Sequence, residues 1–291
     1  MHWTGKVEPI AFTIFNKDVA WYGIILTCAM LIGLFVGLKL AKRNGIKSDD
    51  ALELFLIAIP LAIIAARLGF VFAHLKSMHS FRDVIAVWDG GLTIMTGAPA
   101  GIIGGFIWCK WRKVDFFKLA DSVVFVMLLS QGLGRWGNFM NQELYGLPVT
   151  NPKLQFFPYA VYIANEGGWH QAAFFYEMVL DITGFFILWF VSRHLYMRGS
   201  GVVLYAMTYA IIRFAMEFCR DSTDILGIPN TNRIFCAVAA GVCLCIFIGM
   251  IIYHKKRKER IWYAHGIPPE FFARKVVPPK DKDDKPAPTT L

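Results

Sequence analysis

The sequence predicts an all-α, polytopic integral membrane protein with about seven transmembrane helices. Of its 291 residues 56% are hydrophobic, and a soluble domain this apolar would lack the polar surface that keeps it dispersed. The apolar residues occur in long blocks with few charges, and a block of about 20 such residues spans a bilayer as a helix. Basic residues cluster between the blocks. These observations predict one membrane domain and leave no room for two soluble ones.

Seven blocks have a length suited to crossing a bilayer. Their approximate ranges are 19–38, 51–73, 92–109, 119–137, 173–192, 201–219 and 234–253. The third is the least regular, because the segment 90–105 contains six glycines and one proline. A break or a re-entrant turn is possible there, and it would be tolerated only if protein buries it.

Lysine and arginine follow every second block. They occur in the segments 39–47, 110–118, 193–198 and 255–260. Cytoplasmic loops carry such an excess, so the N-terminus is predicted outside and the C-terminus in the cytoplasm. Residues 139–171 then form an outward cap loop on a membrane domain of residues 1–258. The polar residues 259–291 are predicted to be a cytoplasmic tail that is disordered at its end.

The remaining composition excludes several classes. Net charge is +9 with a pI of about 9.3, but the charges flank apolar blocks, so no nucleic-acid partner is predicted. Six cysteines without a CxxC pair predict no metal site. They are expected to pack as small apolar residues, with a Cys219–Cys236 disulfide as the alternative for that pair. Residues 1–20 lack the continuous apolar stretch of a cleavable signal peptide.

Three arginines, Arg67, Arg135 and Arg213, lie within or at the ends of apolar blocks. An arginine at mid-bilayer costs roughly 2.5–3.5 kcal/mol, so such residues are usually functional or paired. At about 1.5 Å per residue they lie roughly 22, 24 and 17 Å from the inner ends of their helices, and hence in the outer half of the bilayer. Because guanidinium binds phosphate oxygens in bidentate fashion, this predicts an anion site in the outer leaflet.

Tyr209, Arg213 and Glu217 follow one another at intervals of four residues, which places them on one helix stripe. An internal Arg–Glu pair that fastens helices together is the alternative interpretation of this stripe.

A polar motif ends the fourth block. It reads Gly134-Arg135-Trp136-Gly137-Asn138-Phe139-Met140-Asn141-Gln142-Glu143, followed by Gly146. The glycines permit close approach of neighbouring backbone, and Asn138, Asn141 and Glu143 fall in the turn that leaves the membrane. Polar residues crowded at this point indicate a site, with an ordinary helix terminus as the alternative.

With these residues in view, the chain resembles the prolipoprotein diacylglyceryl transferase family. The family motif G-R-x-G-N-F-x-N-x-E-x-x-G is matched from Gly134 to Gly146. Matches run in order from about residue 20 to 253, and include Trp21-Tyr22-Gly23, Ala66-Arg67-Leu68-Gly69, Val87-Trp88-Asp89-Gly90-Gly91, Asp121, Phe175-Tyr176-Glu177, and Tyr209, Arg213, Glu217 and Arg220.

The resemblance implies a multi-pass enzyme of the bacterial cytoplasmic (inner) membrane that needs no cofactor. Its partners would be phosphatidylglycerol, whose diacylglyceryl group is transferred, and a prolipoprotein signal peptide whose lipobox cysteine thiol accepts it. Glycerol phosphate leaves. Arg135 and Arg213 correspond to essential arginines. The implied substrate-binding residues are Tyr22, Arg67, Gly90, Met95, Asn138, Asn141, Gly146, Tyr209 and Glu217.

The sequence departs from the family where a histidine usually serves as general base. Met95 occupies that position, Phe70 replaces a usual tyrosine, and Trp169-His170-Gln171 lacks the usual His-Pro. We therefore expect Arg135 and Arg213 to clamp the phosphate, Glu143 or His170 to relay the thiol proton, and Met95 to line the pocket. A cysteine thiol is already a few per cent thiolate at pH 7, which lessens the need for a base.

Two other functions remain open from sequence. Met95 favours a non-catalytic relative that binds phospholipid or lipoprotein. A transporter or channel is the other, although the chain lacks the internal repeat that many transporters contain.

Overall fold

The computed structural model describes residues 7–14, 17–87, 90–220 and 231–263. Its helices are α1 (Trp21–Arg43), α2 (Ser48–Ala73), α3 (Phe81–Ile85), α4 (Ile94–Arg112), α5 (Phe116–Val123), α6 (Val126–Met140), α7 (Ala173–His194), α8 (Ser200–Met216) and α9 (Thr231–Lys256). Strand β1 (Ile10–Ile14) pairs antiparallel with β2 (Lys17–Ala20), and β3 (Ala160–Ile163) with β4 (Gly168–Gln171).

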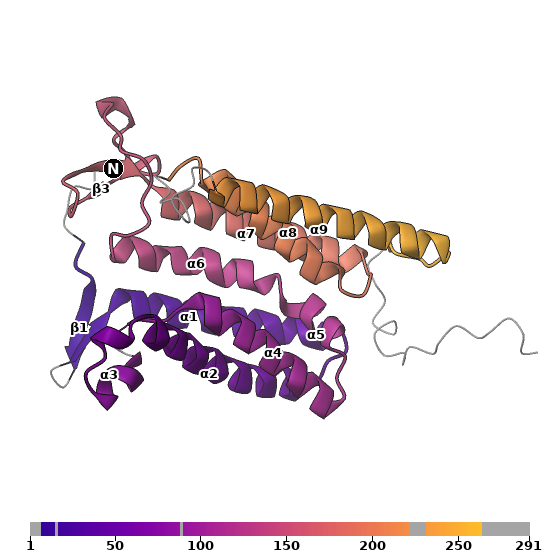
Figure 1. Cartoon of the computed structure of the whole chain (residues 1–291). Helices are drawn as coiled ribbons and strands as arrows, with labels where there is room; N and C mark the ends of the chain where they lie inside the picture. The colour runs from indigo at the N-terminus through magenta and orange to yellow at the C-terminus, as the bar shows by residue number, and fades with distance from the viewer. Residues whose placement is uncertain (1–6, 15–16, 88–89, 221–230, 264–291) are drawn as a thin grey trace, which may run out of the picture.

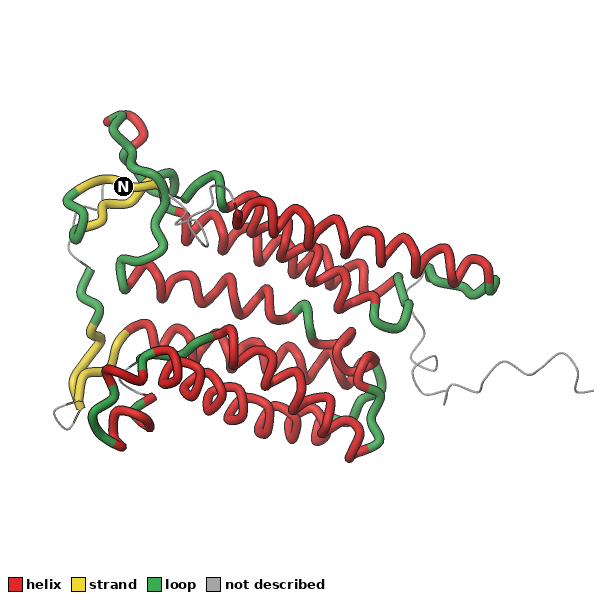
Figure 2. Tube along the Cα trace, in the orientation of Figure 1, coloured by secondary structure: helices red, strands yellow, loops and turns green. Residues whose placement is uncertain are grey.

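The long helices lie side by side (Figure 1). Helix α2 packs on α4, α1 on α6, α6 on α7, and α8 on α7 and α9. Both hairpins and α3 gather at one end of the bundle, which we call the hairpin end (Figure 2). The segments 39–47, 110–118, 193–198 and 255–260 lie at the opposite, basic end (Figure 1).

Glycines let helices approach closely where the bundle is tightest. A Cβ on Gly97 of α4 would lie 2.9 Å from the carbonyl oxygen of Ala62 and 2.9 Å from the Cβ of Ala66 on α2. A Cβ on Gly137 of α6 would lie 2.8 Å from the ring of Tyr22 on α1. The glycines of the polar motif and of the third block therefore have a packing role.

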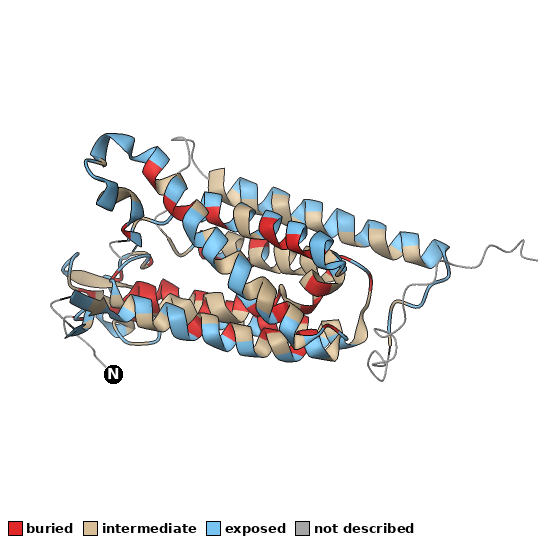
Figure 3. Ribbon diagram, turned by 90° about the horizontal axis from the view of Figure 1, so that it is seen from below, coloured by how far each residue is buried: buried red, intermediate tan, exposed pale blue. Residues whose placement is uncertain are grey.

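Many residues along the outside of the helices are exposed (Figure 3), and a large share of them are apolar. Large side chains such as Phe35, Leu56, Ile64 and Phe235 are more than half exposed, which suits contact with lipid rather than water. Among the described residues, four helices are long and apolar enough to cross a membrane, namely α1, α2, α7 and α9. The pair α5 and α6, bent by 42°, would form a fifth.

Each of the seven predicted blocks contains a helix, but two details differ from the prediction. The third block is not broken, because α4 runs continuously through Pro99. The break lies in the fourth block, between α5 and α6.

The expectation of an all-α chain also needs correction. The sequence analysis missed both hairpins, since strands of four or five residues give little periodic signal. Near the predicted tail, Tyr196 N–H donates to Ile261 O and Tyr263 N–H to His194 O, so this part is ordered. Predictions for residues 1–6, Trp88, Asp89 and 264–291 lie outside the described residues. All six cysteines are free.

We expect Gly97→Ala to lower the free energy of unfolding by about 1–3 kcal/mol, because the added methyl group must push α2 and α4 apart. Thermal unfolding of the detergent-solubilised protein measures this. Gly241→Ala on α9 is the matched control, because a Cβ there meets no atom within 4 Å. Equal melting temperatures for the two variants would contradict this account of α2–α4 packing.

Candidate active site

The fully buried carboxylate of Glu177, near the start of α7, accepts hydrogen bonds from three arginines in separate segments of the chain. Its Oε1 accepts from Arg135 Nη2 of α6 at 2.6 Å and from Arg213 Nη1 of α8 at 3.2 Å. Its Oε2 accepts from Arg220 Nη2, just beyond α8, at 2.7 Å. Glu177 is 0% exposed. Charge-assisted hydrogen bonds in such surroundings are strong, so this carboxylate joins α6, α7 and the end of α8.

Glu217 extends the cluster toward α9. Its Oε1 accepts from Arg213 Nη2 at 3.0 Å, and its backbone carbonyl accepts from Arg233 Nη2 at 3.1 Å. Tyr209 lies one turn before Arg213 and stacks on Tyr205 with ring centroids 6.2 Å apart. The predicted Tyr209–Arg213–Glu217 stripe is therefore present. The predicted internal Arg–Glu pair also exists, and it belongs to the same cluster as Arg135.

The cluster contains buried polar atoms that lack a hydrogen-bond partner among the described residues. They include the Nε–H donors of Arg135 and Arg220, and Oε2 of Glu217. Both carboxyl oxygens of Asp181, one turn beyond Glu177, also have no partner there. A buried donor without an acceptor costs about 1–3 kcal/mol. Within the described part of the chain, the two arginine donors are therefore suited to a further anion.

The polar motif leads from this cluster to the hairpin end. Asn138 Nδ2 donates to Glu143 Oε1 at 2.9 Å, and Asn141 is exposed in the turn after α6. A Cβ on Gly146 would lie 2.7 Å from Cys219 O and 2.7 Å from Gln171 Cβ, so glycine is required there. The motif thus holds the cap loop against the end of α8.

His170 lies on β4, within this cap. Its Nδ1 is 3.0 Å from the carbonyl oxygen of Gly146, and its ring packs edge-on against Tyr145. Because a carbonyl only accepts, Nδ1 carries the proton and Nε2 is the basic nitrogen. In the same cap, a hydrogen bond from Tyr145 to Glu166 raises the pKa of the Tyr145 hydroxyl.

The structure separates Arg67, Gly90 and Met95 from this cluster. The guanidinium of Arg67 donates to four backbone carbonyls of the segment after α2, those of Asp83, Val84, Gly90 and Gly91. Arg67 is buried. It therefore braces the segment that leads into α4 and does not join Arg135 and Arg213. Met95, in the first turn of α4, is 78% exposed.

An apolar groove of about 420 Å³ runs between α1, α2, α5 and α6. Small residues such as Gly37 and Ala58 line it. Gln131 lines the groove one helical turn before Arg135, a rise of about 6 Å along α6. The groove therefore reaches toward the arginine cluster from the middle of the bundle.

Sequence reasoning missed the central residue of the site. Glu177 entered only as part of a family match, and Asp181 was not considered. A usable signal was present, because two acids at an i, i+4 spacing inside an apolar block face the same side of a helix. Such acids need basic partners on neighbouring helices.

A helical bundle with an apolar exterior, a cluster of guanidinium groups around a buried carboxylate and an apolar groove defines the class of multi-pass membrane proteins. The family model of prolipoprotein diacylglyceryl transferase matches residues 9–257. The chain therefore belongs to the prolipoprotein diacylglyceryl transferase family.

Individual relatives agree over nearly the whole length. The chain is 36% identical over 260 residues to phosphatidylglycerol–prolipoprotein diacylglyceryl transferase 1 of Clostridium perfringens, covering 87% of this chain and 98% of that protein. It is 34% identical to the transferase of Clostridioides difficile, covering 88% and 99% of the two chains. It is 32% identical to the transferase of Lactobacillus delbrueckii subsp. bulgaricus, covering 90% of this chain and 96% of that protein.

We expect Glu177→Gln to lower the free energy of unfolding by about 3–5 kcal/mol, because three mostly buried guanidinium groups lose the fully buried anion that they share. Arg198→Gln is the control, since its ion pair with Asp115 is largely exposed and is worth about 0–1 kcal/mol. Thermal unfolding in detergent compares the two. A Glu177 variant as stable as the control would show that the arginines do not depend on this carboxylate.

Proposed function

We propose that this chain transfers the diacylglyceryl group of phosphatidylglycerol to the lipobox cysteine thiol of a prolipoprotein, forming a thioether and releasing glycerol phosphate. The observation that carries the proposal is the position of the arginine cluster above the apolar groove. An acyl chain in the groove would place a lipid phosphate near Arg135 and Arg213. The buried Nε–H groups of Arg135 and Arg220 would then gain an acceptor.

The reaction is a displacement at a glycerol carbon. The thiolate sulfur attacks the diacylglycerol carbon that is bonded to a phosphate oxygen, a C–S bond forms, and the C–O bond breaks with its electron pair going to phosphate. Charge develops on the departing phosphate. Preorganised guanidinium groups in a low-dielectric site stabilise this charge without reorganising, which is usually the largest catalytic contribution.

The thiol proton goes to a base or to water. Glu143, hydrogen-bonded to Asn138, and Nε2 of His170 are the two candidates near the cap. Met95 has no titratable group and cannot accept this proton. Tyr22, Asn138, Asn141, Gly146 and Tyr209 would shape the substrate site, while Arg67 and Gly90 would act through the segment before α4.

We further propose seven membrane crossings, with α5 and α6 forming one of them. All four basic segments lie at the end opposite the hairpins, which supports a cytoplasmic C-terminus and an external hairpin end (Figure 1). The membrane domain of residues 1–258 would reside in the bacterial cytoplasmic membrane, with residues 259–291 on its inner side. The lipid headgroup and the lipobox cysteine would then meet at the external end.

We expect Arg135→Ala and Arg213→Ala each to lower kcat by at least about 10²–10³-fold, the loss typical of removing one donor to developing charge. Purified protein, phosphatidylglycerol vesicles and a lipobox peptide are incubated, and mass spectrometry detects the peptide thioether. Arg198→Ala is the control, because its ion pair lies at the basic end. Thioether formation at the unmodified rate in either variant would refute the phosphate clamp. No transfer by the unmodified chain would indicate a lipid-binding protein instead.

The two candidate bases are separated by Glu143→Gln and His170→Gln. The variant that lacks the true base should transfer the diacylglyceryl group about 10²–10⁴-fold more slowly at pH 7. Its rate should rise as the pH approaches about 8.5, where the peptide thiol ionises unaided. Rates measured from pH 6 to 9 with the same peptide give the profile. Profiles in both variants that match the unmodified protein would exclude both residues as the base.

A further inference from the structure

Helix α8, which carries Tyr209 and Arg213 and ends just before Glu217, has no side-chain cap of its own at its N-terminus. Its N-cap residue, Gly199, has no side chain and adopts a φ of 89°. The first N–H groups of a helix need acceptors from elsewhere. Asp121 of α5 provides them, since its Oδ2 accepts from Gly199 N–H at 2.6 Å and its Oδ1 from Val202 N–H at 3.2 Å.

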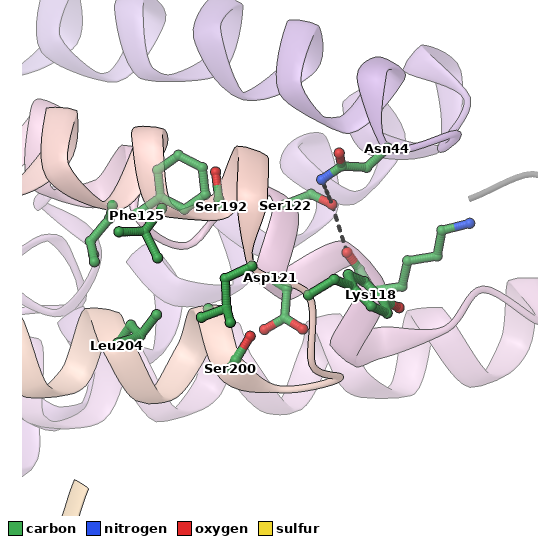
Figure 4. Close-up of a pocket in the computed structure, with 13 residues that line it drawn as sticks. Asn44, Lys118, Asp121, Ser122, Phe125, Ser192, Ser200 and Leu204 are labelled. Atoms are coloured by element: carbon green, nitrogen blue, oxygen red, sulfur yellow. Dashed lines mark hydrogen bonds between the residues drawn. The ribbon is translucent and has the colours of Figure 1, made fainter. Parts of the chain in front are cut away.

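The capping carboxylate belongs to another helix and lies 78 residues from Gly199 in sequence. The contact therefore caps α8 and also fixes it to α5. Helix α8 also approaches α5 closely. A Cβ on Gly201 would lie 2.8 Å from Asp121 Cα and 3.0 Å from Asp121 O. A negative charge at this position also interacts favourably with the helix dipole. Figure 4 shows Asp121 directed toward the turn that contains Ser200.

The two helices joined by Asp121 lead to the candidate active site. Through the bend at residues 124–125, α5 continues into α6, which carries Arg135. Arg213 follows Val202 by 11 residues along α8, a distance of about 17 Å. Because an α-helix is stiff along its axis, the contact at the start of α8 constrains the axial position and rotation of the whole helix. It thereby constrains where Arg213 and Glu217 lie relative to Glu177.

We propose that Asp121 is a positioning residue for the reaction, which it serves by fixing α8 against α5 from the basic end of the bundle. The proposal rests on the proposed function for its rate measurement, but its geometry can be tested without catalysis. A misplacement of about 1 Å at a reacting group costs about 10²-fold in rate. Loss of the anchor should therefore act on kcat while the groove that binds the lipid remains intact.

The test compares Asp121→Ala, Asp121→Asn and Gly201→Ala with Ser122→Ala. Ser122, the next residue, is the control. It is buried, accepts a hydrogen bond from Asn44 and donates one to Lys118 O. Among the described residues its side chain binds no N–H group of α8. We expect Asp121→Ala and Gly201→Ala to lower kcat about 10²-fold with KM for phosphatidylglycerol unchanged. Asp121→Asn, which keeps one acceptor oxygen, should recover part of the rate. Ser122→Ala should lower the melting temperature without lowering kcat.

A second measurement does not depend on activity. Spin labels at Met140→Cys and Ala215→Cys, in a background without the native cysteines, report the distance between the outer ends of α6 and α8. This distance should change in Asp121→Ala and stay constant in Ser122→Ala. An unchanged distance in Asp121→Ala would overturn the proposal, as would equal kcat losses in Asp121→Ala and Ser122→Ala. Absence of transfer by the unmodified chain would refute the proposed function, while the label distance would still decide the role of Asp121.

Discussion

The arrangement of this protein depends on one buried anion, the carboxylate of Glu177. Three guanidinium groups inside an apolar bundle repel one another, and each is costly to remove from water. Glu177 offsets this cost by accepting from all three, and it does so from the first turns of α7, where the helix enters the bundle. Arg135, Arg213 and Arg220 are therefore held mostly inside the bundle, with 16%, 23% and 12% of their side chains exposed. The three helical segments that carry the four residues are held together by the same contacts.

Close packing is what brings these charges within reach of one another. Helix α6 passes α7 at Gly132, where a Cβ would lie 3.1 Å from Asp181 Cβ, and it passes α1 at Gly137, against Tyr22. Gly184 of α7 lies equally close to Thr208 of α8. Gly132 and Gly184 on α6 and α7, together with Gly137 of the polar motif, thus set the distance between helices, and the arginine and amides of the motif supply the polar groups.

The sequence predicted those parts of the fold that depend on local composition. Apolar blocks located the helices, and the basic segments now found at one end predicted the alternation of the chain. The role of Arg67 was not predictable, because its four acceptors are backbone carbonyls that only the tertiary fold brings together. Depth alone placed Arg67 with Arg135 and Arg213, but residues at equal depth on different helices need not be neighbours. For the same reason the central position of Glu177 required the packing of α6, α7 and α8.

The pairing of Arg135 and Arg213 with Glu177 bears on how a phosphate would be held. Both arginines donate to one oxygen of the carboxylate, and Arg135 keeps its Nε–H without an acceptor among the described residues. A lipid phosphate could therefore bind at that donor while Glu177 still neutralises part of the surrounding charge. The guanidinium groups would not have to be assembled or dehydrated when the lipid arrives, since both costs are met during folding. Charge that develops on the leaving phosphate then meets donors that are already fixed in place, and this is the condition under which electrostatic stabilisation is most effective.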